Sequence, residues 1–336
     1  MYHFSDVRHV HLEISSLCNA ACPLCPRNFY GYPYNDGYVE HNMTLAEAKQ
    51  IFYPEFVQQL DATFLNGNFG DAVMNLETVA IIEYLKLCSP MLVVSMSTNA
   101  GARDQKYWET LAGLNVRVMF CIDGLEDTHS LYRQNTLYST VIKNAKIFIA
   151  AGGHAVWKMI SFDHNQHQRA TAQSLSKQMG FKSFEFVDHG RNQAPVFDKD
   201  QQLSHTIGKP VNVEFHRLWK SRTQDEVLLE DILPKRTPKN IHCKIKKQKS
   251  IYVSSTGDVY PCCFLGFAPK TYGHGNYHAA ANAQFRHFVQ ENNALEFGLE
   301  HSINWFNSIE KTWTIPTFEE GRLVICNDVC GQKSAK

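Results

Sequence analysis

The sequence has no excess of either charge and no long apolar run. Lys and Arg together number 33, as do Asp and Glu, among 336 residues, so no long-range field favours nucleic acid and no nucleic-acid partner is expected. The N-terminal residues contain no uninterrupted apolar stretch typical of a signal peptide, and no later segment has the length needed to span a bilayer. We therefore expect a cytoplasmic protein without a membrane partner.

The sequence also lacks internal repeats and low-complexity segments. Its hydrophobic content of 44% over 336 residues allows one large core, or one core with a smaller appended domain. Cysteine is the informative residue type, with ten copies. In a reducing cytoplasm these thiols are not expected to pair as structural disulfides, and clustered thiols there bind metal or carry out chemistry.

Strand-like and helical patterns alternate along the first part of the chain. The strand-like runs are His9–Ile14, Ala62–Leu65, Met91–Met96, Val116–Ile122, Ala155–Phe162 and Ser183–Val187. Helical patterns cover Leu76–Leu87, Arg103–Leu114, Val141–Ala151 and Gln168–Met179, and an earlier helix begins at a capping box of Thr44 and Glu47 and ends at Pro54. The alternation predicts an α/β fold, a partial (β/α)6 TIM-like barrel with its chemistry at the C-terminal ends of the strands.

The pattern predicts three regions. Residues 1–190 form the barrel core, residues 191–240 a connecting helical segment, and residues 241–336 a small C-terminal domain. The last region contains a β-hairpin whose turn is Thr256-Gly257-Asp258.

Three cysteines form a CxxxCxxC motif directly after the first predicted strand: Cys18, Cys22 and Cys25. Chance would produce this triplet in about one chain in a hundred of this length and cysteine content. Three thiolates leave one iron of a [4Fe–4S] cluster open to an external ligand. A structural zinc site would need a fourth ligand, and His9 and His11 lie on a strand that should point them back into the barrel. We favour the iron–sulfur interpretation.

The motif and the βα repeats that follow it resemble the radical S-adenosylmethionine (SAM) superfamily, and the resemblance extends along nearly the whole chain. It implies that the open iron binds the amino and carboxylate groups of SAM. It also implies that one electron cleaves SAM into methionine and a 5′-deoxyadenosyl radical, which abstracts hydrogen from a substrate. The electron would come from a donor such as flavodoxin or ferredoxin.

Three further segments carry the resemblance. The segment Gly67-Asn68-Phe69-Gly70-Asp71 stands where the superfamily has a Gly-Gly-Glu-like segment that meets the SAM amino group, although an ordinary βα turn would look the same. Asn99 stands in a Thr-Asn-Gly-like segment and is expected to hydrogen-bond SAM or the substrate. Cys121 and Asp123 lie in a Ser-Ile-Asp-Gly-like segment, with Cys121 in place of the serine that touches ribose, and Arg133 downstream is the expected partner of the SAM carboxylate.

A second set of cysteines lies in the C-terminal region. Cys243 and Cys262 have the spacing C-x13-G-x4-C, and Cys326 and Cys330 follow as CxxxC. This pattern is similar to the twitch domain, the short relative of the SPASM extension, and implies one auxiliary [4Fe–4S] cluster with these four ligands. Cys263 is a rival for Cys262, but adjacent strand residues point to opposite faces. A zinc-binding knuckle with four cysteine ligands is the alternative for the same residues.

The sequence leaves the substrate and the catalytic acid–base residues open. The expected substrate is a small molecule or a peptide, and a peptide would need a separate leader-binding partner, so we favour a small molecule. Candidates for acid–base chemistry at the barrel mouth are Lys158, Asp163, His164 and Asp188-His189. The alternative outside enzymology is a catalytically inactive, metal-stabilised binding protein.

Overall fold

The computed structural model describes residues 1–33, 38–188, 193–208, 214, 216, 237–267, 284–285 and 288–332. Its centre is an eight-stranded sheet in the order β13-β12-β1-β4-β5-β6-β7-β8. Neighbouring strands pair in parallel from β12 through β1 to β8, and only β12 and β13 pair in antiparallel. The structure therefore confirms the α/β prediction of a partial, TIM-like barrel.

The strands of the large sheet have the following bounds: β1 His9–Leu12, β4 Ala62–Leu65, β5 Val93–Thr98, β6 Arg117–Cys121, β7 His154–Ile160, β8 Ser183–Val187, β12 Ser250–Val253 and β13 Val259–Tyr260. Three small antiparallel pairs accompany them: β2 Asn28–Phe29 with β3 Tyr32–Pro33, β9 Ala194–Phe197 with β10 Leu203–Ile207, and β11 Asn240–Ile241 with β14 Gly331–Gln332. Each of the six predicted strands is present, with ends shifted by two residues at most.

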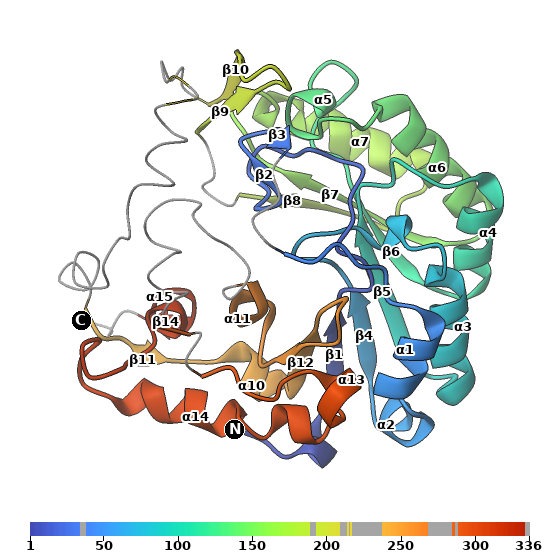
Figure 1. The fold of residues 1–336 in the computed structure, drawn as a ribbon. Helices are drawn as coiled ribbons and strands as arrows, with labels where there is room; N and C mark the ends of the chain where they lie inside the picture. The colour runs from blue at the N-terminus through green and yellow to red at the C-terminus, as the bar shows by residue number, and fades with distance from the viewer. Residues whose placement is uncertain are drawn as a thin grey trace.

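The helices have the following bounds: α1 Leu45–Ile51, α2 Pro54–Gln58, α3 Thr78–Cys88, α4 Gln105–Gly113, α5 His129–Tyr132, α6 Tyr138–Ala150, α7 Arg169–Met179, α10 Lys244–Gln248, α11 Cys263–Phe267, α13 Ala294–Phe297, α14 Phe306–Lys311 and α15 Val324–Cys330. Helices α3, α4, α6 and α7 lie along the outer face of the sheet (Figure 1). Within the described residues, no helix combines the length and the apolar character needed to cross a bilayer.

The predicted capping box is present at the start of α1. The Thr44 side chain accepts a hydrogen bond from the Glu47 backbone, and the Glu47 side chain accepts one from the Thr44 backbone. The prediction that Pro54 ends this helix was wrong in its detail. Helix α1 already ends at Ile51, and Pro54 begins α2 at the first helical position, where its missing N–H and fixed φ cost nothing.

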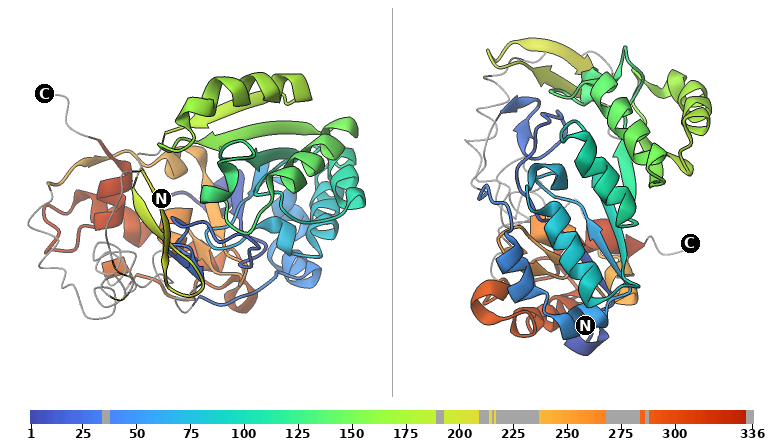
Figure 2. Two further views of the ribbon diagram at one scale, coloured as in Figure 1. Left: turned by 90° about the horizontal axis from the view of Figure 1, so that it is seen from above. Right: turned by 90° about the vertical axis from the view of Figure 1, so that its right-hand side faces the viewer.

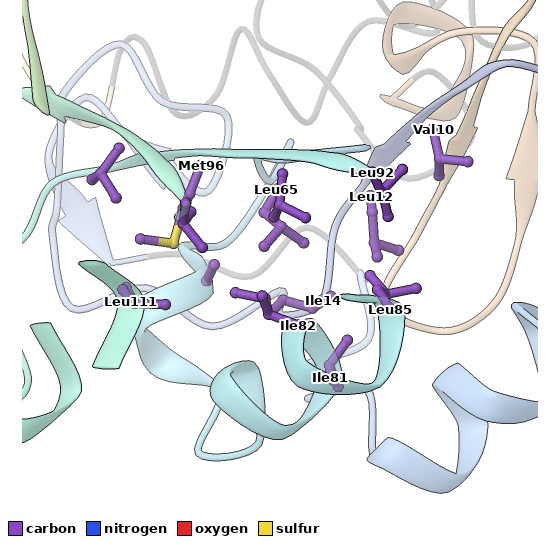
Figure 3. Close-up of a cluster of buried hydrophobic side chains, with 14 of the residues drawn as sticks. Val10, Leu12, Ile14, Leu65, Ile81, Ile82, Leu85, Leu92, Met96 and Leu111 are labelled. Atoms are coloured by element: carbon purple, nitrogen blue, oxygen red, sulfur yellow. The ribbon is translucent and has the colours of Figure 1, made fainter. Parts of the chain in front are cut away.

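The main core lies between the sheet and the outer helices. Figure 3 shows Leu12, Leu65 and Met96, from three neighbouring strands, facing Ile81 and Leu85 of α3. These five side chains are almost completely buried. Truncating one of them to alanine would cost about 2–5 kcal/mol. Along each strand the alternate side chains point away from this core, into the barrel.

The C-terminal region joins the barrel at its β1 edge. Strand β12 pairs in parallel with β1, and β13 returns from it through the predicted turn, where Gly257 has φ +85°. The N-terminus lies beside this region (Figure 2), and the Met1 amino group is 3.0 Å from a carboxylate oxygen of Glu310 in α14. Residues 193–208 of the predicted connecting segment contain the β9–β10 hairpin, and almost all of positions 209–236 lie outside the described residues.

Candidate functional site

The three cysteines of the CxxxCxxC motif lie on the loop that follows β1. Cys22 is buried, while Cys18 and Cys25 are half-buried. A short turn, in which the Cys25 N–H donates to the Cys22 carbonyl at 3.0 Å, brings the thiols together. All three line one cavity of about 260 Å³ at the C-terminal ends of the strands.

The cavity keeps these thiols protonated when no metal is bound. Burial raises the pKa of Cys18 and Cys25, and it raises the pKa of Cys22 to about 12. Two side-chain N–H groups offset this cost, since Asn99 Nδ2 lies 3.6 Å from Cys18 Sγ and Arg133 Nη1 lies 3.6 Å from Cys22 Sγ. Donors aimed at sulfur suit thiolates that hold a metal cluster.

The donor set therefore fits a [4Fe–4S] cluster with one open iron. The histidines weighed as zinc ligands are engaged elsewhere: His11 Nε2 lies 2.7 Å from the Asn66 carbonyl and His9 Nδ1 lies 2.8 Å from the Gln248 carbonyl. Desolvation also lowers the pKa of His11 to about 4. In the described part of the chain, the side chains as they stand form no preassembled metal-binding group of three or more His, Cys, Asp and Glu, either at this motif or at the C-terminal cysteines.

The segment Gly67–Asp71 forms one wall of the same cavity. A Cβ added at Gly70 would lie 1.9 Å from the Ser15 carbonyl oxygen, and one at Gly67 would lie 2.3 Å from the Gly70 oxygen. Both positions therefore require glycine. Asp71 is buried, its two oxygens accept from the Val73 and Asn99 backbones at 3.1 and 2.7 Å, and desolvation raises its pKa.

Glu13 is a site residue that the sequence analysis missed. Its Oε1 accepts hydrogen bonds from the backbones of Phe69 and Gly70 at 2.7 and 3.0 Å, and its other carboxylate oxygen accepts one from the Tyr252 hydroxyl. Glu13 is almost completely buried. An acidic residue inside an otherwise apolar strand end was the available signal, because a buried carboxylate needs several donors.

Asn99 and Arg133 line the cavity. Asn99 is nearly fully buried, and its Nδ2 donates to Asn19 Oδ1 at 3.0 Å. Arg133 Nε donates to Asp123 Oδ2 at 2.6 Å, and Asp123 Oδ1 accepts from the Ile160 backbone at 2.5 Å. Asp123 is fully buried and is not among the residues that line the cavity, so it orients Arg133 from behind.

Ser97, Cys121 and Lys158 come from the ends of three neighbouring strands, β5, β6 and β7, and line the cavity floor. Ser97 Oγ lies 3.2 Å from Cys121 Sγ. The hydroxyl that the Cys121 position lacks is thus present on the adjacent strand. Ser97 was missed because the sequence alone does not give the register that places it beside Cys121.

Of the other acid–base candidates, Asp163, His164 and Asp188 are not among the residues that line this cavity. Asp163 is exposed, and His164 stacks on Phe162 with ring centroids 5.2 Å apart. Desolvation lowers the pKa of His164. Asp188 lies near the end of the described stretch, and His189 is outside the described residues.

The C-terminal cysteines line a second cavity of about 440 Å³. Cys243 precedes α10, Cys262 follows β13, and Cys326 and Cys330 lie one turn apart on α15. A hydrogen bond with Cys330, together with backbone N–H groups at the start of α10, lowers the pKa of Cys243 to about 6. Cys263 also borders the cavity.

The two adjacent cysteines have different electrostatic neighbours. Burial raises the pKa of the Cys262 thiol, and the neighbouring thiols of Cys263, Cys326 and Cys243 add to this effect. Burial also raises the pKa of Cys263, with a smaller contribution from the Glu13 carboxylate of the first site. Both cysteines line the second cavity, so the choice of Cys262 as the ligand rests on its spacing from Gly257.

Two contacts join the walls of the two cavities. Asn68 Nδ2 donates to the Cys263 carbonyl at 2.8 Å. The rings of Phe69 and Phe267 stack with centroids 5.4 Å apart and an interplanar angle of 10°. The Gly67–Asp71 segment thus contacts the first cavity on one side and α11 on the other.

No protein-family model and no curated protein sequence matches this chain. Among solved structures, it is similar to Streptococcus suis SuiB bound to S-adenosylmethionine, with a TM-score of 0.55 and 14% identity over 96% of this chain and 77% of SuiB. It is also similar to anSMEcpe with bound AdoMet, with a TM-score of 0.52 and 17% identity over 87% of this chain and 79% of anSMEcpe. At these identities the likenesses establish a shared fold.

Proposed function

We propose that this chain is a radical SAM enzyme. The observation that carries the proposal is the convergence of Cys18, Cys22 and Cys25 with Gly67–Asp71 and Arg133 on one cavity at the strand ends. When bound to these thiolates, a [4Fe–4S] cluster would supply the electron that cleaves SAM to methionine and a 5′-deoxyadenosyl radical. The shared fold with two proteins whose structures contain bound SAM supports this assignment.

The chain's own residues would bind and orient SAM. Arg133, held by Asp123 at 2.6 Å, offers its remaining N–H groups to the SAM carboxylate. The backbone of the Gly67–Asp71 wall, packed against Ser15 where only glycine fits, would meet the SAM amino group, and Asp71 would supply negative charge for it.

The side chains of Ser97 and Lys158 extend the same cavity toward the barrel interior. Ser97 is the proposed hydroxyl partner of the SAM ribose, in place of Cys121. Lys158 is the candidate proton donor or acceptor for the substrate, because among the acid–base candidates that lie in the described residues it alone lines the cavity.

We also propose one auxiliary [4Fe–4S] cluster on Cys243, Cys262, Cys326 and Cys330. Their convergence on one cavity and the C-x13-G-x4-C spacing of Cys243 and Cys262 support this ligand set. A zinc ion on the same thiolates is the competing occupant. Metal analysis distinguishes them, since two [4Fe–4S] clusters require about eight iron atoms per chain and one requires about four.

Both a peptide and a small molecule stay open as substrates. A structural neighbour, SuiB bound to precursor peptide SuiA, shares the fold with a TM-score of 0.53 and 13% identity over 95% of this chain and 76% of SuiB, and favours a peptide. A peptide maturase would use a separate leader-binding partner. Transfer of deuterium from a labelled candidate substrate into 5′-deoxyadenosine would identify the class.

The test of the main proposal is anaerobic reconstitution followed by dithionite and SAM, with 5′-deoxyadenosine measured by chromatography. We expect product from the parent chain, none from Cys22→Ala, and product from the control Cys88→Ala, whose thiol lines neither cavity. Absence of product from a fully iron-loaded parent chain would instead favour a metal-stabilised binding protein.

A further inference from the structure

Trp313 brings an unpaired hydrogen-bond donor to the second cavity. Its side chain lines the cavity together with Cys326, and its indole Nε1 is buried without a hydrogen-bond partner in the described part of the chain. A buried N–H that finds no acceptor costs about 1–3 kcal/mol. Cys326 lines the same cavity, so its sulfur is the candidate acceptor for this N–H.

The Arg322 guanidinium is a buried positive charge that contacts the backbone of Trp313. The Arg322 side chain is 6% exposed. Its Nη1 donates to the carbonyls of Trp313 and Ile315 at 2.5 and 2.9 Å, and its Nη2 donates to the Lys239 carbonyl. Every hydrogen bond that the Arg322 side chain makes within the described residues therefore goes to a neutral backbone oxygen, and its Nε is buried without a partner there.

A buried cation without a counter-charge is costly, so a negative group nearby is expected. Arg322 precedes Cys326 by four residues, and its guanidinium donates to the carbonyl of Trp313, which lines the cavity, so the charge lies next to this site. Four thiolates around a cluster would supply the missing negative charge. Trp313 and Arg322 are also joined to each other, because the guanidinium holds the Trp313 backbone.

A purely structural role is the competing explanation. Arg322 ties together three backbone segments, and an unpartnered indole N–H also occurs elsewhere in the described chain. Trp305 is such a case: its Nε1 is buried without a partner, and its ring packs on Tyr260, Phe285 and Phe306 outside the lining of the cysteine cavity. Trp305 is therefore a matched control for Trp313.

We propose that Trp313 and Arg322 set the reduction potential of the auxiliary cluster, through an N–H···S hydrogen bond to Cys326 and a fixed buried positive charge. The proposal rests on the auxiliary cluster proposed above. Reduction adds one electron and one negative charge to the cluster and breaks no bond, and the electron comes from dithionite in the assay. A donor to sulfur and a nearby cation stabilise the more negative state, so both raise the potential.

The test uses the full chain with Cys18, Cys22 and Cys25 changed to Ala, so that the remaining iron belongs to the auxiliary site. The potential is measured by an electron paramagnetic resonance titration with dithionite, after iron and zinc analysis. In this background we expect Trp313→Phe to lower the reduction equilibrium constant about tenfold, which is about 59 mV for one electron. Arg322→Gln should lower the constant at least as much, and Trp305→Phe should leave it unchanged.

A second measurement needs no variant that risks misfolding. With ¹⁵N-labelled indoles, the reduced site should show hyperfine coupling to one indole nitrogen and its exchangeable proton. An iron-containing site with unchanged potentials in both variants and no indole coupling would overturn this proposal alone. A site that binds zinc and no iron would overturn the auxiliary cluster and this proposal together.

Discussion

Gly70→Ala tests whether the backbone of the Gly67–Asp71 segment forms the SAM site. The added Cβ would lie 1.9 Å from the Ser15 carbonyl oxygen, whereas ordinary contact begins at 3.4 Å. The obstacle is backbone rather than a flexible side chain, so the loop itself must move by about 1.5 Å or the Ser15 strand end must yield. Moving the loop breaks the Glu13 hydrogen bonds to Phe69 and Gly70.

The size of the effect follows from this geometry. Overpacking of this kind costs about 1–3 kcal/mol of unfolding free energy. Displacement of a ligand-binding wall by about 1 Å can reduce turnover about 100-fold. We therefore expect Gly70→Ala to lower the urea midpoint of the metal-free chain and to reduce 5′-deoxyadenosine formation by about 100-fold, with weaker SAM binding by calorimetry.

Gly113→Ala is the control for this prediction. Gly113 is the last residue of α4, and an added Cβ there meets nothing within 4 Å. This substitution should leave SAM cleavage unchanged and should keep or slightly raise the urea midpoint, because alanine is the better helix former. Equal midpoints and equal SAM affinities for Gly70→Ala and the parent chain would refute the placement of the loop.

Three other predictions concern the two proposed cofactor sites and a buried histidine, His129 at the start of α5. Iron analysis should show that Cys262→Ser loses the auxiliary iron, about four of eight atoms per chain, and that Cys263→Ser retains it. Asp123→Asn removes the charge that holds Arg133 Nε at 2.6 Å. In the 5′-deoxyadenosine assay the KM for SAM should therefore rise more than kcat falls. A larger fall in kcat than rise in KM would contradict a positioning role for Asp123. Desolvation lowers the pKa of His129 from 6.5 to about 4, so the unfolded chain takes up the proton first as the pH falls. Neutral His129 therefore contributes to the free energy of unfolding in full above pH 6.5, and about 3 kcal/mol of this contribution is lost as the pH falls toward 4. Urea unfolding across this range measures the loss, and His129→Gln should flatten the profile.

The strands of the barrel were predictable because each is a short β-branched or aromatic run between clear helical patterns. Strand β12 is different. Its sequence predicted one arm of a hairpin, which is correct, but its parallel pairing with β1 brings Ser250 beside His9. No local pattern encodes a contact across about 240 residues, so the sequence could not show that the C-terminal hairpin continues the barrel sheet.

The site residues also divide into those that the sequence indicated and those that it did not. The CxxxCxxC spacing pointed to Cys18, Cys22 and Cys25, and the resemblance to the radical SAM superfamily pointed to the Gly67–Asp71 segment and Arg133; all of them line one cavity. The residues that support them were missed, since Glu13, Ser97 and Trp313 act across strands or between distant segments. Asp123 was predicted as a cofactor ligand, and its complete burial behind Arg133 favours a positioning role instead.

Glu13 explains how one fold can position both cavities. Its carboxylate binds the Phe69 and Gly70 backbones on one side and the Tyr252 hydroxyl of β12 on the other. The next contact outward, from Asn68 Nδ2 to the Cys263 carbonyl, reaches the residue beside the proposed ligand Cys262. Because these contacts follow one another through packed backbone, a shift in the Gly67–Asp71 wall would also shift the start of α11. The two proposed clusters would then keep a fixed separation, as electron transfer between them and a shared substrate would require.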